Sequence, residues 1–248
     1  MRDLLIKLSM IFISGVILWL WEIRTPFIQI EYKATFLKDF GTSLISTGFT
    51  FVIIYLFAPV INLIASPLIK ESLIAIWILS LPVWIRVIIA YLLSDLSSYL
   101  LHRAMHRNQF LWLAHHWHHS IKSLWWLAGQ KISLTSSFLF QFAFIWFPLL
   151  YIPPEVMIFV FLHNTVNSHW THLNIKRKPW MRVMEWVYCT PSLHSLHHYQ
   201  AQGKNLGVMF TFFDRIFGTY VDPDTVDRNQ DQFGLGDEPV TLKTILGI

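Results

Sequence analysis

Hydrophobic residues collect in five long stretches, separated by shorter polar or basic stretches. They run from about Leu4 to Leu20, Ser43 to Ala65, Ile74 to Leu93, Ser133 to Ile152 and Val156 to His169. The first four are near the roughly 20 residues that a helix needs to cross a bilayer, and the fifth is shorter. Pro153 and Pro154 separate the last two stretches. This predicts a hairpin that enters the membrane and returns to the side it left.

The first and third stretches carry further information. No small-residue cleavage site follows Leu20, so we expect the first stretch to be a retained helix and not a signal peptide. The helical pattern of the third continues from Ile74 to His106, with Pro82 as a possible kink. At about 1.5 Å per residue such a helix is roughly 50 Å long, whereas the hydrocarbon core is roughly 30 Å thick. Its histidine-bearing end should therefore protrude from the membrane.

The composition agrees with a membrane protein. Of the 248 residues, 54% are hydrophobic and 14% charged, and the mean hydropathy is +0.46. A soluble domain needs a more polar surface than this. The net charge is +4, but Lys and Arg lie beside the apolar stretches, so we do not predict nucleic-acid binding. The single cysteine, Cys189, excludes an intramolecular disulfide and a cysteine-rich metal site.

Basic residues also predict which side of the membrane carries the histidines. Eight of them lie in the histidine-bearing segments: Arg103, Arg107, Lys122, Lys131, Lys176, Arg177, Lys178 and Arg182. By the positive-inside rule that side is cytoplasmic. The predicted location is a bacterial inner membrane, or the endoplasmic reticulum in a eukaryote.

All twelve histidines fall between His102 and His198. His102 and His106 are four residues apart and share one face of a helix. The segments 115–119 and 194–198 repeat a stronger pattern, with histidines at i, i+3 and i+4, which lie on one side of a helix. His116 points about 100° away from that side and is predicted to be a bystander.

The second of these histidine triplets follows a helix start. Thr190 can cap the helix, and Pro191 suits its first turn. Between the triplets, His169 and His172 are three residues apart and share a face, so both are predicted ligands. His163 lies deeper in the apolar segment, where a hydrogen-bonded core histidine is at least as reasonable an interpretation as a ligand.

This number of imidazoles predicts at least two metal ions, because one ion cannot use them all. The predicted ligands are His102, His106, His115, His118, His119, His169, His172, His194, His197 and His198. One alternative is a pair of zinc ions that only staple helices, but structural zinc sites close with four ligands. Another is bis-histidine haem, which does not suit triplets at the membrane edge.

These positions give the chain a family resemblance. It resembles the fatty acid hydroxylase and sterol desaturase superfamily at Asp95, Tyr99, Arg103, the histidines above except His169, Thr190–Pro191 and the segment 213–220. The resemblance spans roughly Ile85 to Val221. It implies an all-α bundle of about four membrane helices with a cytosolic helical cap that carries the histidines, and a di-iron centre that uses O2. The expected parts are membrane helices at 1–84, a catalytic domain at 85–221 and an acidic, solvated tail at 222–248.

The implied activity is hydroxylation of a lipid C–H bond in a fatty acyl, sterol, ether or amino lipid. Desaturation by the same centre is the alternative, and a metal-binding scaffold or transporter is a less favoured one. Electrons should come from a separate protein of the ferredoxin or cytochrome b5 type, and zinc can replace iron on overexpression. Asp95 and Tyr99 share a face with His102 and are expected to orient an imidazole. Trp125, Trp126, Gln130 and Lys131 stand where relatives are expected to carry Asn and Arg, so the resemblance does not identify the substrate.

Overall fold

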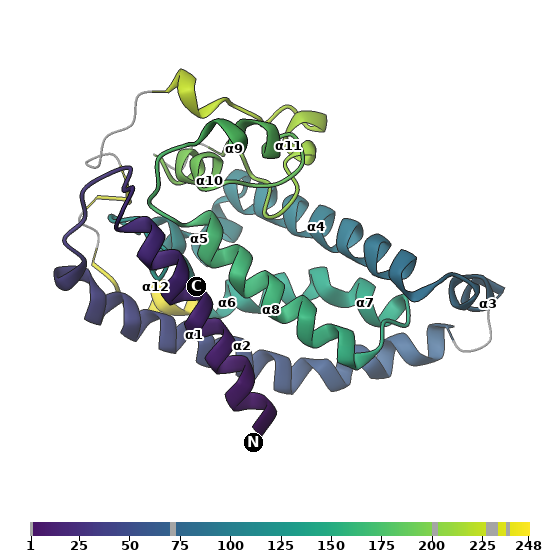
Figure 1. Cartoon of the computed structure of the whole chain (residues 1–248). Helices are drawn as coiled ribbons and strands as arrows, with labels where there is room; N and C mark the ends of the chain where they lie inside the picture. The colour runs from purple at the N-terminus through teal and green to yellow at the C-terminus, as the bar shows by residue number, and fades with distance from the viewer. Residues whose placement is uncertain (1, 70–72, 200–202, 227–232, 237–238) are drawn as a thin grey trace.

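The computed structural model describes residues 2–69, 73–199, 203–226, 233–236 and 239–248. Within these residues the regular structure is helical, with three isolated β-bridges and no strand (Figure 1). The elements are α1 (Arg2–Glu22), α2 (Tyr32–Ile69), α3 (Leu73–Ser80), α4 (Val83–Arg107), α5 (Gln109–His119), η1 (Ala128–Gln130), α6 (Leu134–Gln141), η2 (Phe142–Ile145), α7 (Trp146–Leu149), α8 (Pro154–Thr171), α9 (Pro179–Met184), α10 (Pro191–His198), α11 (Phe212–Ile216), η3 (Pro223–Thr225) and α12 (Leu242–Leu246).

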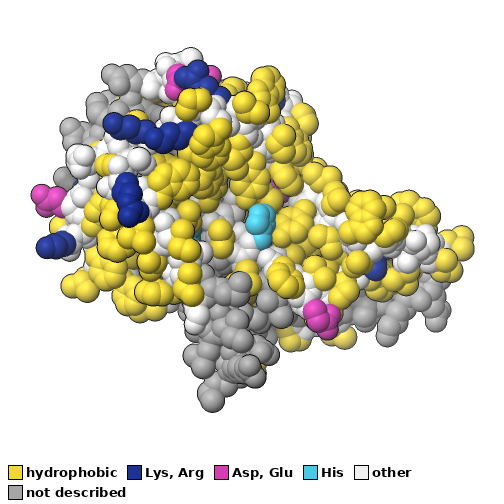
Figure 2. All heavy atoms as spheres, in the orientation of Figure 1, with side chains coloured by type: hydrophobic (Ala, Val, Ile, Leu, Met, Phe, Trp, Pro, Cys, Tyr) yellow, Lys and Arg dark blue, Asp and Glu magenta, His cyan; other side chains and the backbone are white. Residues whose placement is uncertain are grey.

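In the described part of the chain, two helical segments are long and apolar enough to cross a bilayer. They are Tyr32–Phe57 of α2, with a mean hydropathy of 1.7, and the whole of α4, with 1.4. Shorter apolar helices cover Phe12–Glu22 and Leu134–Leu149. Large hydrophobic side chains are exposed along α2, α3 and α4, and Figure 2 shows such side chains over much of one face. Exposed apolar area on this scale is unfavourable in water and suits lipid, which confirms the predicted all-α membrane protein.

The predicted continuous helix from Ile74 to His106 is interrupted. α3 ends at Ser80 and α4 begins at Val83, with Pro82 at φ −53° and ψ 144°. Proline has no N–H to donate and disfavours the helical conformation of the residue before it, so the chain breaks here where the sequence predicted a kink. α4 alone still has 25 residues, about 37 Å, and exceeds the hydrocarbon core.

The predicted hairpin is formed by α6 to α7 and by α8, with Pro154 in the first turn of α8. Arg86 of α4 fixes the turn between the two arms. Its Nη1 donates to the carbonyl oxygens of Leu150, at 3.0 Å, and Tyr151, at 2.7 Å. Beneath the turn, Phe147 and Val160 pack with Ala90 of α4 in one hydrophobic cluster. The guanidinium thus satisfies carbonyls that the end of α7 leaves open.

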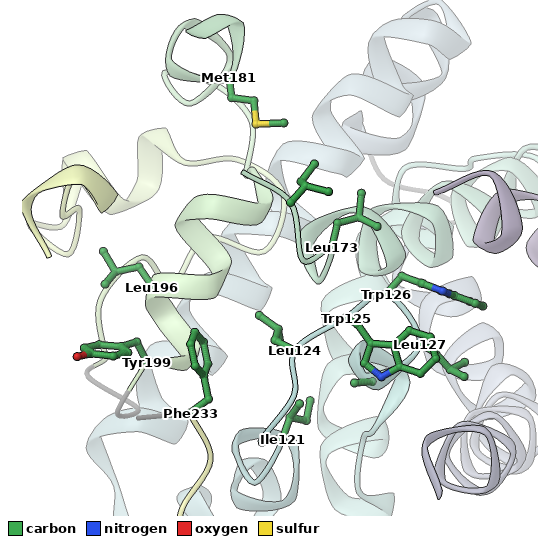
Figure 3. Packing of buried hydrophobic residues seen from close by; sticks show 12 residues of the cluster. Ile121, Leu124, Trp125, Trp126, Leu127, Leu173, Met181, Leu196, Tyr199 and Phe233 are labelled. Carbon is green, nitrogen blue, oxygen red and sulfur yellow. The ribbon is translucent and has the colours of Figure 1, made fainter. Parts of the chain in front are cut away.

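A second hydrophobic cluster forms the core of the cap, by which we mean the described residues of 108–133 and 172–221. Leu124, Leu173 and Leu196 belong to this cluster and come from three separate segments (Figure 3). α1 joins this cap through Glu22, which is fully buried. Its Oε2 accepts the backbone N–H groups of Trp126, at 3.2 Å, and Asn174, at 3.0 Å.

The tail was expected to be solvated, and the structure places parts of it against the cap. Phe233 is buried in the cap core and pairs with Tyr199 in an isolated bridge. α12 packs against α5 and α6, where Thr135 donates to the carbonyl of Leu246 at 2.8 Å. The residues at 227–232 and 237–238 lie outside the described part of the tail.

Candidate metal centre

The hairpin of α4 and α5 brings four histidine rings into contact. They are His102 and His106 of α4 and His115 and His119 of α5. Asn108 ends α4 and caps α5, and its Oδ1 accepts the N–H groups of Phe110 and Leu111. The chain therefore reverses within one residue, which brings the end of α4 beside the end of α5. Across this hairpin the Nε2 atoms of His102 and His115 lie 2.9 Å apart.

The remaining histidines of the site come from α10 and from the end of α8. α10 begins as the sequence predicted, with the Thr190 hydroxyl accepting the N–H of Leu193 and Pro191 in the first turn. This cap fixes the phase of His194, His197 and His198, all of which are buried. His172 lies at the C-cap of α8, and its Nε2 is 2.9 Å from that of His194.

Nine histidines form two groups. Within each group, one ring nitrogen of every histidine lies within 4.8 Å of those of the others. The α4 group consists of His102, His106, His115, His119 and His197, and the α8 group of His118, His172, His194 and His198. The groups are adjacent, since the rings of His119 and His198 stack with centroids 4.6 Å apart. Helices α5 and α10 each supply histidines to both groups.

Backbone carbonyls set the tautomers of four rings. The Nδ1 atoms of His102, His118, His172 and His197 lie 2.7 to 3.0 Å from the carbonyl oxygens of Leu206, Lys131, Ser168 and Lys204 respectively. Since a carbonyl can only accept, each Nδ1 carries the proton and donates it. The Nε2 lone pairs are therefore free to bind a metal, which is the usual arrangement around metal-ligating histidines.

The pairing and spacing of these ring nitrogens suit metal coordination better than hydrogen bonding between imidazoles. Among the residues that the structure describes, buried atoms with no hydrogen-bond partner include Nε2 of His106 and His197 and both ring nitrogens of His119. Burying such groups unpaired is costly. Two nitrogens that bind one ion at about 2.1 Å lie at most about 4.2 Å apart, and the closest Nε2 pairs, at 2.9 to 3.3 Å, satisfy that limit.

The electrostatics favour neutral imidazoles. Burial, and then the charge that neighbouring imidazoles would carry, lowers the pKa of the histidines in α5 and α10 that belong to the two groups well below the usual value. Burial lowers the pKa of His172 to about 4. The neutral form is the one that binds metal, so these rings are ready to bind at neutral pH.

Three histidines lie outside both groups. His169 was a predicted ligand, but its ring stands edge-on to Trp126, with centroids 5.0 Å apart. His163 is 3.2 Å from the Tyr188 hydroxyl through its Nε2, as expected for a hydrogen-bonded core histidine. His116 is half-buried beside Trp112, away from the ligands, as its helical phase predicted.

Asp95 and Tyr99 hydrogen-bond to the segment 209–219, Asp95 to its backbone and Tyr99 to a side chain, and not to an imidazole. Asp95 accepts the N–H groups of Met209, at 3.0 Å, and Phe210, at 2.8 Å. The Tyr99 hydroxyl is 2.7 Å from Thr219 Oγ1. Both residues thus brace the segment that contains Leu206, whose carbonyl accepts from His102.

Sequence reasoning overlooked two residues that shape this site. Asp214 accepts the N–H groups of Leu206, at 2.7 Å, and Gly207, at 2.9 Å, and so holds the acceptor for His102. It lies in the segment 213–220 that carried the family resemblance, which was an available signal. Gly129 of η1 leaves room for His172, because a Cβ atom there would lie 2.3 Å from that ring.

Comparison with known proteins agrees with this geometry. The sequence matches the profile of the fatty acid hydroxylase family over residues 87–219. It is 26% identical over 148 residues to the ornithine lipid hydroxylase OlsE of Rhizobium tropici, covering 57% of this chain and 44% of the relative. The match thus spans less than half the length of that relative, and no solved structure matches. Because the family profile covers more than half of the 248 residues, the chain belongs to the fatty acid hydroxylase family.

Proposed function

We propose that this protein hydroxylates a membrane lipid with O2 at a centre of two iron ions. The observation that carries the proposal is the convergence of nine histidines, eight of them buried and His106 half-buried, in two adjacent groups. The family and the lipid hydroxylase among its relatives support the reaction class. Because that relative acts on ornithine lipid, a lipid with an amino-acid head group is the first substrate to test.

The α4 group would hold one ion and the α8 group the other. Imidazole suits iron, and no carboxylate joins either group among the described residues. When bound, the two ions would supply the oxidising power to insert one oxygen atom of O2 into a C–H bond. The balanced reaction consumes two electrons and two protons and releases water. Since imidazole supplies no electrons, we propose a separate donor protein of the ferredoxin or cytochrome b5 type.

The chain itself contributes position and a dry environment. The carbonyls of Leu206, Lys131, Ser168 and Lys204 keep the metal-binding nitrogens turned inward. Eight of the nine grouped histidines are buried, and so is Trp117 on the same helix as three of them. Exclusion of water strengthens the electrostatic interactions inside and limits side reactions.

We further propose that the protein crosses a bacterial inner membrane several times, with the histidines on the cytoplasmic side. The basic residues of the histidine-bearing segments support this orientation. A cysteine introduced at Lys122, which is exposed, tests it. An impermeant thiol reagent should label Lys122→Cys only after the cells are opened. Labelling in intact cells would reverse the proposed orientation.

The function is tested by mass spectrometry of lipids from cells that express the protein or its variants. The expected product is a lipid heavier by one oxygen atom, which becomes labelled when cells are grown under isotopically labelled O2. His119→Ala should abolish the product, whereas His116→Ala, on the same helix, should retain it. A lipid that instead lacks two hydrogens would identify a desaturase. Unlabelled oxygen in the product would exclude O2 as its source.

A further inference from the structure

Large hydrophobic side chains are exposed on α9, on α11 and on the residues that directly follow each of these helices. We call this surface the cap foot, and it consists of Trp180, Val183, Trp186, Val187, Ile216 and Phe217, with exposed fractions between 38% and 75%. Figure 2 shows hydrophobic side chains over this part of the cap, running without interruption into those over the helices below. A patch of this kind normally marks a contact with a partner or a membrane.

The cap foot lies beside the membrane helices and not above them. The Tyr188 hydroxyl, next to Val187, is 3.2 Å from His163 of α8, and Asp95 of α4 binds the N–H of Phe210. His163 precedes the end of α8 by eight residues, and Asp95 precedes His102 by seven. At about 1.5 Å per residue, these anchor points lie about 12 Å and 10 Å further into the helices than their histidine-bearing ends.

The cap foot is also continuous with the lipid-exposed side of α4. The ring of Phe217 stacks on Tyr99 with centroids 5.2 Å apart. Leu100, the next residue of α4, is 48% exposed and lies within the candidate span Val83–Arg107. A single apolar surface therefore extends from a membrane-crossing segment onto the cap.

Arginines lie at the edge of this surface. Arg215 places its guanidinium 4.5 Å from the centroid of Trp186, and Arg103 lies 5.6 Å from that of Phe217. The side chain of Arg182 is 64% exposed and pairs with Asp224. Tryptophan and arginine together are typical of the membrane interface, where the ring lies among acyl chains and the cation reaches phosphate head groups.

We propose that the cap foot is immersed in the interfacial region of the bilayer, so that the cap is bound to the membrane independently of the spanning helices. The occupant of this surface is the phospholipid leaflet that surrounds the helices. The cap would then be fixed in tilt and depth relative to the lipid, on the side where α9 and α11 lie. This inference rests on the membrane location of the chain and does not depend on the proposed reaction.

Spin labels in nanodiscs of phosphatidylcholine and phosphatidylglycerol test the proposal. Labels are placed on the full chain through Val183→Cys and Ile216→Cys, with Ile88→Cys of α4 as the lipid reference and the exposed Lys176→Cys as the water reference. The native Cys189 is buried, and burial raises the pKa of its thiol, so it should label poorly. The unmodified chain measures that background.

Relaxation by O2 and by a water-soluble nickel chelate distinguishes the outcomes. Labels at Val183 and Ile216 should respond as the Ile88 label does, with strong relaxation by O2 and little by nickel. A response like that of Lys176 would overturn the proposal. So would labels that are open to nickel until an acidic electron-carrier protein is added, which would make the cap foot a protein-docking surface. Metal content equal to that of the unmodified chain verifies that each labelled variant is folded.

Discussion

Replacing Gly129 with alanine should remove metal from the α8 group while the α4 group keeps its own. A Cβ atom at Gly129 would lie 2.3 Å from Cγ and 2.4 Å from Nδ1 of His172. Carbon atoms in contact are normally about 3.5–4.0 Å apart, so one of the two groups must move by more than about 1 Å. The ring of His172 cannot swing freely, because its Nδ1 donates to the carbonyl of Ser168 at 2.7 Å.

The size of this movement decides the outcome. Metal–nitrogen distances tolerate about ±0.2 Å, which is several times less than the displacement required. Disturbing groups that only orient a ligand costs about 10–100-fold in metal affinity. Displacing the ligand itself should therefore weaken the α8 group by at least that factor. Overpacking should also lower the free energy of unfolding by about 1–3 kcal/mol.

The assay is metal content per folded chain, together with lipid hydroxylation and thermal unfolding. Gly129→Ala should retain about half of the wild-type metal and lose hydroxylation. Gly48→Ala in α2 is the matched control, because a Cβ atom there has no neighbour within 4 Å among the described residues. That control should keep full metal and activity, and it should gain stability, since alanine is favoured over glycine in a helix by about 0.5–1 kcal/mol. A Gly129→Ala variant with full metal content and normal hydroxylation would refute the ligand role of His172.

Three further predictions concern the ligands and their supports. His119→Ala should lose metal and hydroxylation together, whereas His116→Ala should keep both in elemental analysis, and the reverse pattern would show that the helical phase of α5 is wrong. Asp214→Asn should lower the melting temperature and the metal affinity, because an amide has one oxygen and cannot accept from both Leu206 and Gly207 as a carboxylate does. Each hydrogen bond to the charged carboxylate contributes about 1.5–3 kcal/mol. An unchanged melting temperature would contradict this prediction. Acid should release the metal. The pKa of His172 in the folded chain is about 4, below the value of 6.5 in the unfolded chain. The contribution of neutral His172 to folding stability is therefore complete above about pH 6.5 and is lost as the pH falls toward 4. Metal content that stays constant over that range in a dialysis series would exclude this mechanism.

The sequence predicted the nine histidines that the structure brings together, with His169 in addition, but not how the nine divide between two groups. Spacing placed His115, His118 and His119 on one side of α5, and the structure assigns His118 to the α8 group and the other two to the α4 group. On a helix, positions i+3 and i+4 differ by about 100°, which is enough to place neighbouring rings in different groups. The group that each ring joins depends on the helix opposite, and helical phase carries no information about that helix.

Other parts of the site depend on contacts that spacing cannot reveal. The acceptors for His102 and His197 are carbonyls of Leu206 and Lys204, and every residue has a carbonyl. His169 shares a helical face with His172 in principle, but α8 ends at Thr171 and its last turn leaves His169 against Trp126. The apolar segments and the cap of α10 were predictable because they depend on local chemistry alone.

The buried carboxylate of Glu22 implies that the smallest piece of chain able to form a complete site is larger than the region that sequence comparison recognises. Glu22 lies far upstream of residues 87–219, yet its Oε2 joins the loop after α5, at Trp126, to the loop after α8, at Asn174. A fragment cut at the family boundary would lack this connection, and those two loops would be held together by side-chain contacts alone. A substitution of Glu22 can therefore inactivate the protein although this residue is not among the grouped histidines. Such a variant should be interpreted as a defect in the assembly of the cap.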